Sequence, residues 1–283
     1  MFQKFISATR YLTRRDPPGM LLKVWPDDTF LVSYPKSGNT WLRFLIANLL
    51  QQEPPIGLRD ADRIVPAVDG RAKKFFNEMS APRVIKSHYC FLAAYKRVIY
   101  IVRDPRDVAV SQYHYQIKRG VLDPGAPMQA FIPRFIAGEV SPYGSWGDHV
   151  GSWLGARRQD ANFFLLRYED MRVNILPVAT SVARFLGLKE DARRVEIAVE
   201  RSSLESMRKL EKAEGDQWLS TKGTRQDMSF FRAAKTGEGK TVLPPESIGL
   251  IEKAWGPLMR ALHYSVSTPE DSATLAPAGA SSE

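Results

Sequence analysis

TFLVSYPKSGNTWLRFLIANLL, residues 29–50, is the stretch that decides the fold class. Its first part, from Thr29 to Tyr34, is a continuous apolar run, which is typical of a strand covered on both faces. From Thr40 to Leu50 the apolar residues recur at helical spacing and form one stripe. A small-residue loop joins the two parts, so the stretch predicts a strand–loop–helix unit.

Three further apolar runs, at residues 83–87, 97–102 and 162–167, are also continuous rather than alternating, and helical periodicity separates them. This pattern predicts parallel βαβ units. Asp104 followed by Pro105 is a typical helix start, so a helix is expected to begin there. We therefore expect an α/β fold: a single three-layer domain over residues 1–265 with a central parallel sheet, and a disordered tail over residues 266–283.

Composition narrows the class of protein. The 283 residues carry a net charge of +9 and a single cysteine, Cys90, which excludes an internal disulfide and fits a reducing compartment such as the cytoplasm. No apolar run reaches the roughly 18 residues that a membrane-spanning helix needs. The first fifteen residues are basic and partly apolar. They suit either an ordinary basic helix or a transit peptide or surface-lying helix.

Two places in the sequence could hold anions. The first is the loop YPKSGNTW at residues 34–41, where small residues and a helix N-terminus favour a phosphate, and which we call the phosphate cradle. It is not the nucleotide-hydrolase consensus, because Lys36 precedes the glycine. The second place combines Arg103 at a strand end with Ser111 two turns into the next helix. Two separated sites suggest a ligand phosphorylated twice, although Arg103 could instead pair with Asp107.

Five motifs in order make a resemblance specific: YPKSGNTW, VIKSHY, IYIVRDPRDVAVSQY, YGSWGDHV and RYEDM. Together they resemble the cytosolic-type sulfotransferase family, with matches between about residues 31 and 240. The resemblance implies that 3′-phosphoadenosine-5′-phosphosulfate (PAPS) is the co-substrate, that its sulfuryl group passes to a hydroxyl or, less readily, an amine, and that no metal takes part.

The resemblance also implies roles for individual residues. The 5′-phosphosulfate would be held by Lys36, Ser37, Gly38, Asn39 and Thr40, and the 3′-phosphate by Arg103, Ser111 and Arg232. Adenine would lie against Trp41, Tyr168, Ser202 and Leu204. The segment after Arg232 departs from the family pattern at Ala233 and Ala234, which removes a lysine contact and predicts a weaker hold on the 3′-phosphate, with Arg232 carrying more of it. An alanine in place of the family's glycine still offers its N–H provided that φ stays negative. The family's dimer motif is not recognisable, so the oligomeric state stays open.

His88 follows the run at residues 83–87, at the edge of the sheet where open α/β proteins bind ligands. Lys86 lies two positions earlier and so points to the same side of the strand. The resemblance implies that His88 is the general base of an in-line transfer, with Lys36 neutralising the leaving phosphate and Lys86 assisting at the sulfuryl oxygens. His149, in the YGSWGDHV segment, is our candidate for acceptor contact, and scattered aromatic residues could join it: Phe75, Phe76, Tyr89 and Trp153.

Three alternatives compete with this interpretation. A nucleotide kinase would share the phosphate cradle but needs a metal-holding acid, and Asp104 is already assigned to helix capping. A nucleic-acid or heparin-binding protein would explain the charge, yet no recognition motif accompanies it, so we expect no nucleic-acid partner. A carbohydrate sulfotransferase of the secretory pathway is disfavoured by the missing disulfide set and signal peptide. We expect a small-molecule or lipid acceptor without integral membrane association.

Overall fold

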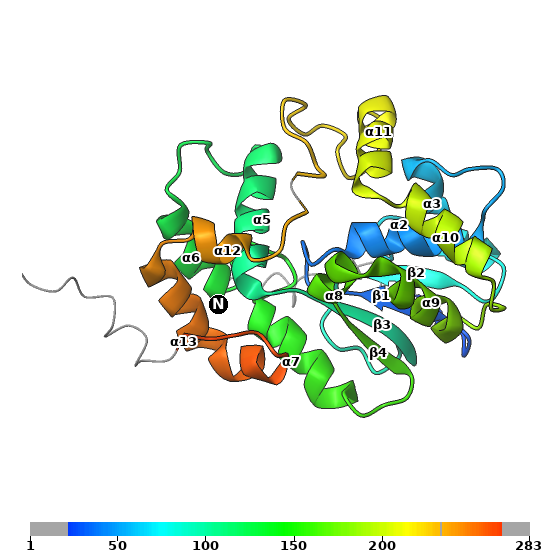
Figure 1. The fold of residues 1–283 in the computed structure, drawn as a ribbon, viewed down its shortest axis with the longest axis horizontal. Coiled ribbons are helices and arrows are strands. Elements are labelled where there is room, and N and C mark those ends of the chain that lie inside the picture. The colour runs from blue at the N-terminus through cyan, green and yellow to red at the C-terminus, as the bar shows by residue number, and fades with distance from the viewer. Residues whose placement is uncertain (1–21, 233, 268–283) are drawn as a thin grey trace, which may run out of the picture.

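The central sheet of the computed structural model, which describes residues 22–232 and 234–267, is parallel and has the strand order β2-β1-β3-β4 (Figure 1). Its strands are β1 (Thr29–Val32), β2 (Val84–Ser87), β3 (Arg97–Val102) and β4 (Phe163–Arg167). Val32 lies opposite Ser87 on one side and Tyr100 on the other. The carboxyl ends of β1, β2 and β3 therefore open onto one edge, where the loop after β1 begins.

Helices connect β1 to β2 and β3 to β4, and a further series of helices follows β4. They are α2 (Asn39–Leu50), α3 (Leu58–Ile64), α4 (Lys73–Glu78), α5 (Pro105–Lys118), α6 (Met128–Ile136), α7 (Trp146–Arg157), α8 (Tyr168–Val173), α9 (Ile175–Phe185), α10 (Ala192–Arg201), α11 (Leu204–Glu214), α12 (Glu238–Val242) and α13 (Pro245–Ala261). None of the helices in the described ranges is long and apolar enough to cross a membrane.

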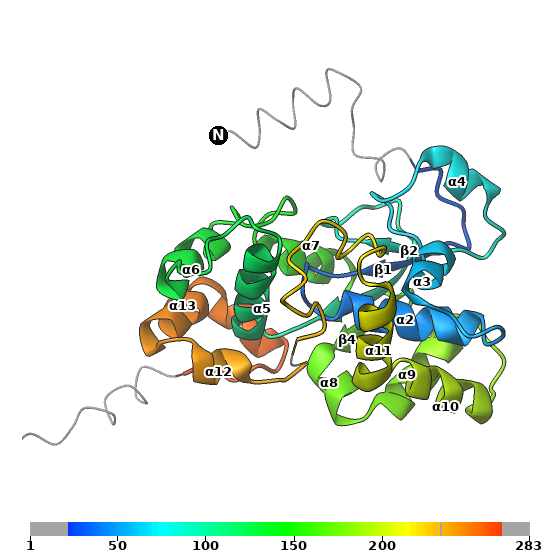
Figure 2. The same cartoon turned by 90° about the horizontal axis from the view of Figure 1, so that it is seen from above.

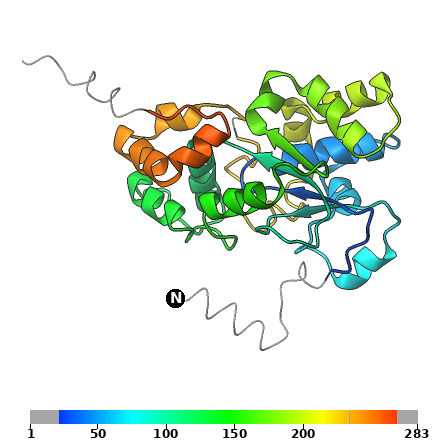
Figure 3. The same cartoon turned by 90° about the horizontal axis from the view of Figure 1, so that it is seen from below.

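Two apolar cores cover the two faces of the sheet. Successive residues of β1 point to opposite sides, so that Phe30 packs into one core and Leu31 into the other. The first core takes in α5, α6, α7 and α13, and the second α2, α9 and α10. Figure 2 shows these two groups of helices on opposite sides, and Figure 3 shows the orange α13 beside the green helices and away from α2. The molecule has the expected three-layer α/β architecture.

The predicted elements are confirmed where they position the site. All four apolar runs are strands, and the helical stripe of residues 40–50 is α2. Asp104 caps α5 by accepting a hydrogen bond from the backbone N–H of Arg106 at 2.9 Å. The basic segment at residues 1–15 lies outside the described residues, as does all but the start of the tail that was expected from residue 266. The extent of the single domain stays a prediction.

Buried ion pairs fix α5 relative to the C-terminal helix. The guanidinium of Arg106 is 2% exposed and lies 2.6 Å from the carboxylate of Asp104 and 2.5 Å from that of Glu252 on α13. A buried charge left without its partner is strongly destabilising, so this arrangement constrains the packing of the two helices. These ion pairs therefore hold α5, the helix that follows β3, in place at the carboxyl edge of the sheet.

Candidate active site

The phosphate cradle is a tight turn that needs unusual backbone conformations. Lys36 has φ 69° and Gly38 has φ 98°, both in the left-handed region. A Cβ at residue 38 would lie 2.5 Å from the Tyr168 ring, so only glycine fits beneath that ring. Asn39 begins α2 and donates from its side-chain amide to Ser33 Oγ at 3.1 Å. The loop thus passes directly under the predicted adenine contact and into a helix N-terminus.

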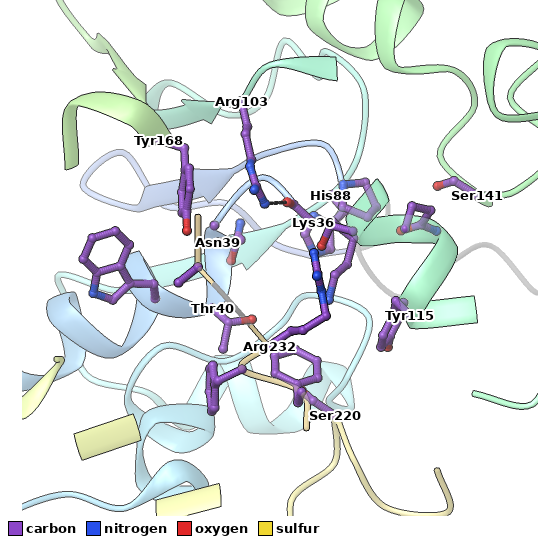
Figure 4. A pocket seen from close by; sticks show the side chains of 18 of the residues that line it. Lys36, Asn39, Thr40, His88, Arg103, Tyr115, Ser141, Tyr168, Ser220 and Arg232 are labelled. Carbon is purple, nitrogen blue, oxygen red and sulfur yellow. Dashed lines mark hydrogen bonds between the residues drawn. The ribbon is translucent and has the colours of Figure 1, made fainter. Parts of the chain in front are cut away.

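A cavity of about 370 Å³ lies above this loop. Most of the predicted site residues line it: Lys36, Gly38, Asn39, Thr40, Trp41, Lys86, His88, Arg103, Ser111, Tyr168, Leu204 and Arg232. Figure 4 shows Arg103 and Tyr168 on one side, Tyr115 and Ser141 on the other, and Lys36 and His88 between them. The predicted catalytic groups therefore lie in the middle of the cavity. We call the end at the predicted nucleotide contacts the nucleotide end, and the opposite end the acceptor end.

Two aromatic rings shape the nucleotide end. Trp41 and Tyr168 meet edge to face, with ring centroids 5.9 Å apart and an interplanar angle of 74°. The guanidinium of Arg103 lies 4.4 Å from the centre of the Tyr168 ring. A flat base can stack on such rings, and the neighbouring cation can hold a phosphate attached to its ribose.

The predicted 3′-phosphate residues already have protein partners. Arg103 donates to the Lys235 carbonyl at 2.8 Å and lies 3.5 Å from the Asp107 carboxylate, so the alternative pairing considered from the sequence exists alongside its place at the cavity. Arg232 donates to Glu238 at 2.6 Å, and Glu238 also lines the cavity. Arg232 lowers the pKa of this carboxyl. An incoming phosphate must compete with that carboxylate for Arg232.

Lys36 is half-buried, and its amine lies among other cations. Its Nζ lies 4.2 Å from the centre of the Tyr115 ring and 4.4 Å from that of Phe230. Burial, and then repulsion from Arg103 and other nearby cations, lowers its pKa to about 7. Binding an anion would reverse this penalty, because an opposite charge favours the protonated amine.

His88 is held in the tautomer that a general base requires. Its Nδ1 lies 2.7 Å from the carbonyl oxygen of Ser33, which can only accept, so Nδ1 carries the hydrogen and Nε2 the lone pair. Burial, and then the charge of Lys86, holds the pKa of His88 well below its usual value. The pKa of Lys86 is lowered to about 8 by burial and then by Arg43. At neutral pH the imidazole is therefore neutral beside a mainly charged amine.

Three predicted contacts lie away from the cavity. His149 is fully buried: its Nε2–H donates to the His88 carbonyl at 3.0 Å, and its Nδ1 accepts from the Tyr100 hydroxyl at 2.9 Å. Ser202 is buried as well, 3.4 Å from the side-chain amide of Asn48. Ser37 is enclosed by the turn of the cradle. The structure thus corrects two assignments: His149 is a support of the His88 loop, and Ser202 packs between helices.

The departures after Arg232 have a backbone consequence. Ala234 stands where the family pattern has glycine, and its φ is 50°, so the condition of a negative φ is not met. A residue with a Cβ is strained in this region by about 1–2 kcal/mol. Ala233 lies outside the described residues.

Sequence reasoning missed the acceptor end of the cavity. It is lined by Gln112, Tyr115, Gln116, Ser141 and Tyr143, whereas none of the aromatic candidates Phe75, Phe76, Tyr89 and Trp153 lines it. A signal was present: residues 111, 112, 115 and 116 share one face of a helix, and all of them are polar. That polar face could have been assigned to a cavity rather than to solvent.

Comparison with known proteins supports this geometry. Residues 26–263 match the sulfotransferase domain family. Bovine sulfotransferase 1A1 is 31% identical over 74% of this chain and 75% of its own length, and human sulfotransferase 2B1 is 36% identical over 57% of this chain and 46% of its own length. A crystal structure of mouse sulfotransferase SULT7A1 with PAP has a TM-score of 0.70 and 26% identity, covering 87% of this chain and 89% of that one. The chain belongs to the sulfotransferase family.

Proposed function

We propose that this protein transfers the sulfuryl group of PAPS to a hydroxyl of a small-molecule acceptor, with His88 as the general base. The family match and the PAP-bound mouse relative support PAPS as the donor. One observation carries the assignment of His88: this residue, whose Nε2 has the lone pair, lines the same cavity as Lys36 and Lys86.

The reaction follows from the placement of charge. The acceptor oxygen attacks sulfur and forms a new S–O bond, while the bond from sulfur to the 5′-phosphate oxygen breaks and its electron pair leaves with PAP. The acceptor proton moves to His88 Nε2. Lys36 stabilises the charge that grows on the leaving phosphate, and Lys86 stabilises the sulfuryl oxygens in flight. The chemistry needs only positioned cations and a neutral base.

PAPS would lie along the cavity with adenine against Trp41 and Tyr168. Its 3′-phosphate would then reach Arg103, Ser111 and Arg232, and its 5′-phosphosulfate the N–H groups at the start of α2. Leu204 adds an apolar contact beside the base. This orientation places sulfur between Lys36 and His88.

The first experiment is calorimetric titration of PAP against the metal-free protein, with 5′-AMP as the ligand that lacks the 3′-phosphate. We expect PAP to bind at least about tenfold more tightly than AMP, because Arg103 and Arg232 lose their anion with AMP. Equal affinity for the two nucleotides would refute the assignment of the 3′-phosphate site. Magnesium-dependent turnover of ATP would favour a kinase instead.

We further propose that the protein works in the cytoplasm and folds as one domain up to about residue 265. The single cysteine fits a reducing compartment. Cell fractionation tests the location, and limited proteolysis tests the domain, since a single domain would give one resistant fragment.

A further inference from the structure

The amine of Lys36 lies in a corner formed by two aromatic rings from distant parts of the chain. Its Nζ is 4.2 Å from the centre of the Tyr115 ring on α5 and 4.4 Å from the centre of the Phe230 ring. The two rings stand almost at right angles, with an interplanar angle of 87° and centroids 6.0 Å apart. An ammonium group within about 6 Å of a ring centre is attracted to the ring face, more strongly where water is excluded. We call Tyr115 and Phe230 the aromatic corner.

The Phe230 side of the aromatic corner is fixed by contacts that do not involve Lys36. The Glu211 carboxylate on α11 accepts hydrogen bonds from the Phe230 backbone N–H at 2.5 Å and from the Ser229 hydroxyl at 2.8 Å. The Trp218 ring meets the Phe230 ring edge to face, with centroids 4.9 Å apart. The corner is therefore built into the fold, and the amine enters a position that other residues have prepared.

The charges that act on this amine have one sign. Burial, and then repulsion from four cations, lowers the pKa of Lys36: Arg103, Arg232, Lys86 and Lys118. A long lysine side chain also loses rotamer freedom when it is fixed, so its ammonium needs an attractive partner to stay in place. A carboxylate would neutralise the amine and compete with an incoming phosphate, as Glu238 does for Arg232. A neutral ring attracts the ammonium and leaves its charge uncompensated.

We infer that Tyr115 and Phe230 are positioning residues, which hold the Lys36 ammonium at the phosphate cradle with its charge available to the 5′-phosphosulfate. This inference rests on the proposed function, in which Lys36 stabilises the charge on the leaving phosphate. Phe230 lies two residues before Arg232, the proposed 3′-phosphate contact. The short segment that docks on Glu211 would therefore contribute at both phosphates of one nucleotide.

The test follows PAP binding by calorimetry from pH 5 to pH 8, without acceptor, in three variants. Phe230→Leu and Tyr115→Leu each replace one ring by an apolar side chain, whereas Tyr115→Phe removes only the hydroxyl. Loss of one ring should lower the pKa of Lys36 by about one unit, because the protonated amine loses its attraction to the ring face. The ratio of variant to wild-type Kd cancels the titration of PAP itself. For each leucine variant this ratio should rise by about tenfold between pH 5 and pH 8, and for Tyr115→Phe it should not change with pH.

Phe185→Leu is the matched control and should give a ratio near one at every pH. The Phe185 ring also lies beside a cation, with its centre 4.9 Å from the guanidinium carbon of Arg97, but it is not part of the cavity. Thermal unfolding shows whether each variant is folded, and if one leucine variant is not, the other carries the test. A ratio that is independent of pH in a folded leucine variant would assign the ring to packing alone and overturn the inference. Tighter PAP binding by that variant, or a pH-dependent ratio for Tyr115→Phe, would overturn it as well, and in each case the proposed function stands. If PAP does not bind to the wild-type protein, both are overturned.

Discussion

The lowered pKa of Lys36 predicts how the affinity for PAP depends on pH. Its pKa of about 7 results first from burial and then from Arg103 and other neighbouring cations. Only the protonated amine can pair with the 5′-phosphate, so half of the unliganded protein is ready to bind at pH 7. At pH 9 the protonated fraction is about one in a hundred. PAP affinity should therefore fall by about 50-fold between pH 7 and pH 9.

Calorimetry at constant ionic strength measures this change, and titrations in buffers of different ionisation enthalpy should show proton uptake on binding above pH 7. Lys36→Arg provides the contrast, because a guanidinium keeps its charge throughout this range and should flatten the profile. Lys212→Arg, at an exposed position on α11, is the control and should keep the wild-type slope. A wild-type affinity that changes by less than about twofold from pH 7 to pH 9 would refute the argument from the depressed pKa.

Three further predictions concern the base, its support and the strained alanine. His88→Ala should lower kcat by about 10²–10⁴ in a sulfate-transfer assay; a smaller loss, with PAP still bound, would assign the base elsewhere. His149→Phe leaves the Tyr100 hydroxyl and the His88 carbonyl unpaired and should lower the free energy of unfolding in urea by about 1–3 kcal/mol for each group; unchanged stability would contradict the role of His149 as a support. Ala234→Gly relieves the positive φ and should stabilise by about 1 kcal/mol, raising Tm by about 2–4 °C in calorimetric scans; an unchanged or lower Tm would show that residue 234 carries no strain.

The layers and the phosphate cradle were predictable because they depend on local sequence. Continuous apolar runs specify strands buried on both faces, and a capping Asp before Pro105 specifies where α5 begins. The same logic placed Arg103 and His88 at the carboxyl ends of strands, where ligands gather. The cavity lining there agrees with those placements.

The contacts that were mistaken depend on which way a side chain faces. His149 and Ser202 lie near the site in sequence motifs, but tertiary packing turns both inward, where hydrogen bonds satisfy their polar atoms. The acceptor end depends on α5 and residues 140–143 coming together in the fold, where Gln112 and Gln116 donate to the Val140 carbonyl, and sequence spacing does not reveal this contact. The conformation of Ala234 likewise follows from the closure of a turn rather than from its own preference.

The missing side chain of Gly38 has an evolutionary consequence. Because the Tyr168 ring lies 2.5 Å from where a Cβ would stand, one added carbon would displace that ring and distort the turn of the phosphate cradle together. A smaller residue at position 168 would remove the steric clash, but residue 38 would still have a backbone φ of 98°. A substitution at Tyr168 therefore cannot compensate for one at Gly38. In evolution, a change at Gly38 therefore needs more than a compensating change at residue 168, because the backbone constraint remains.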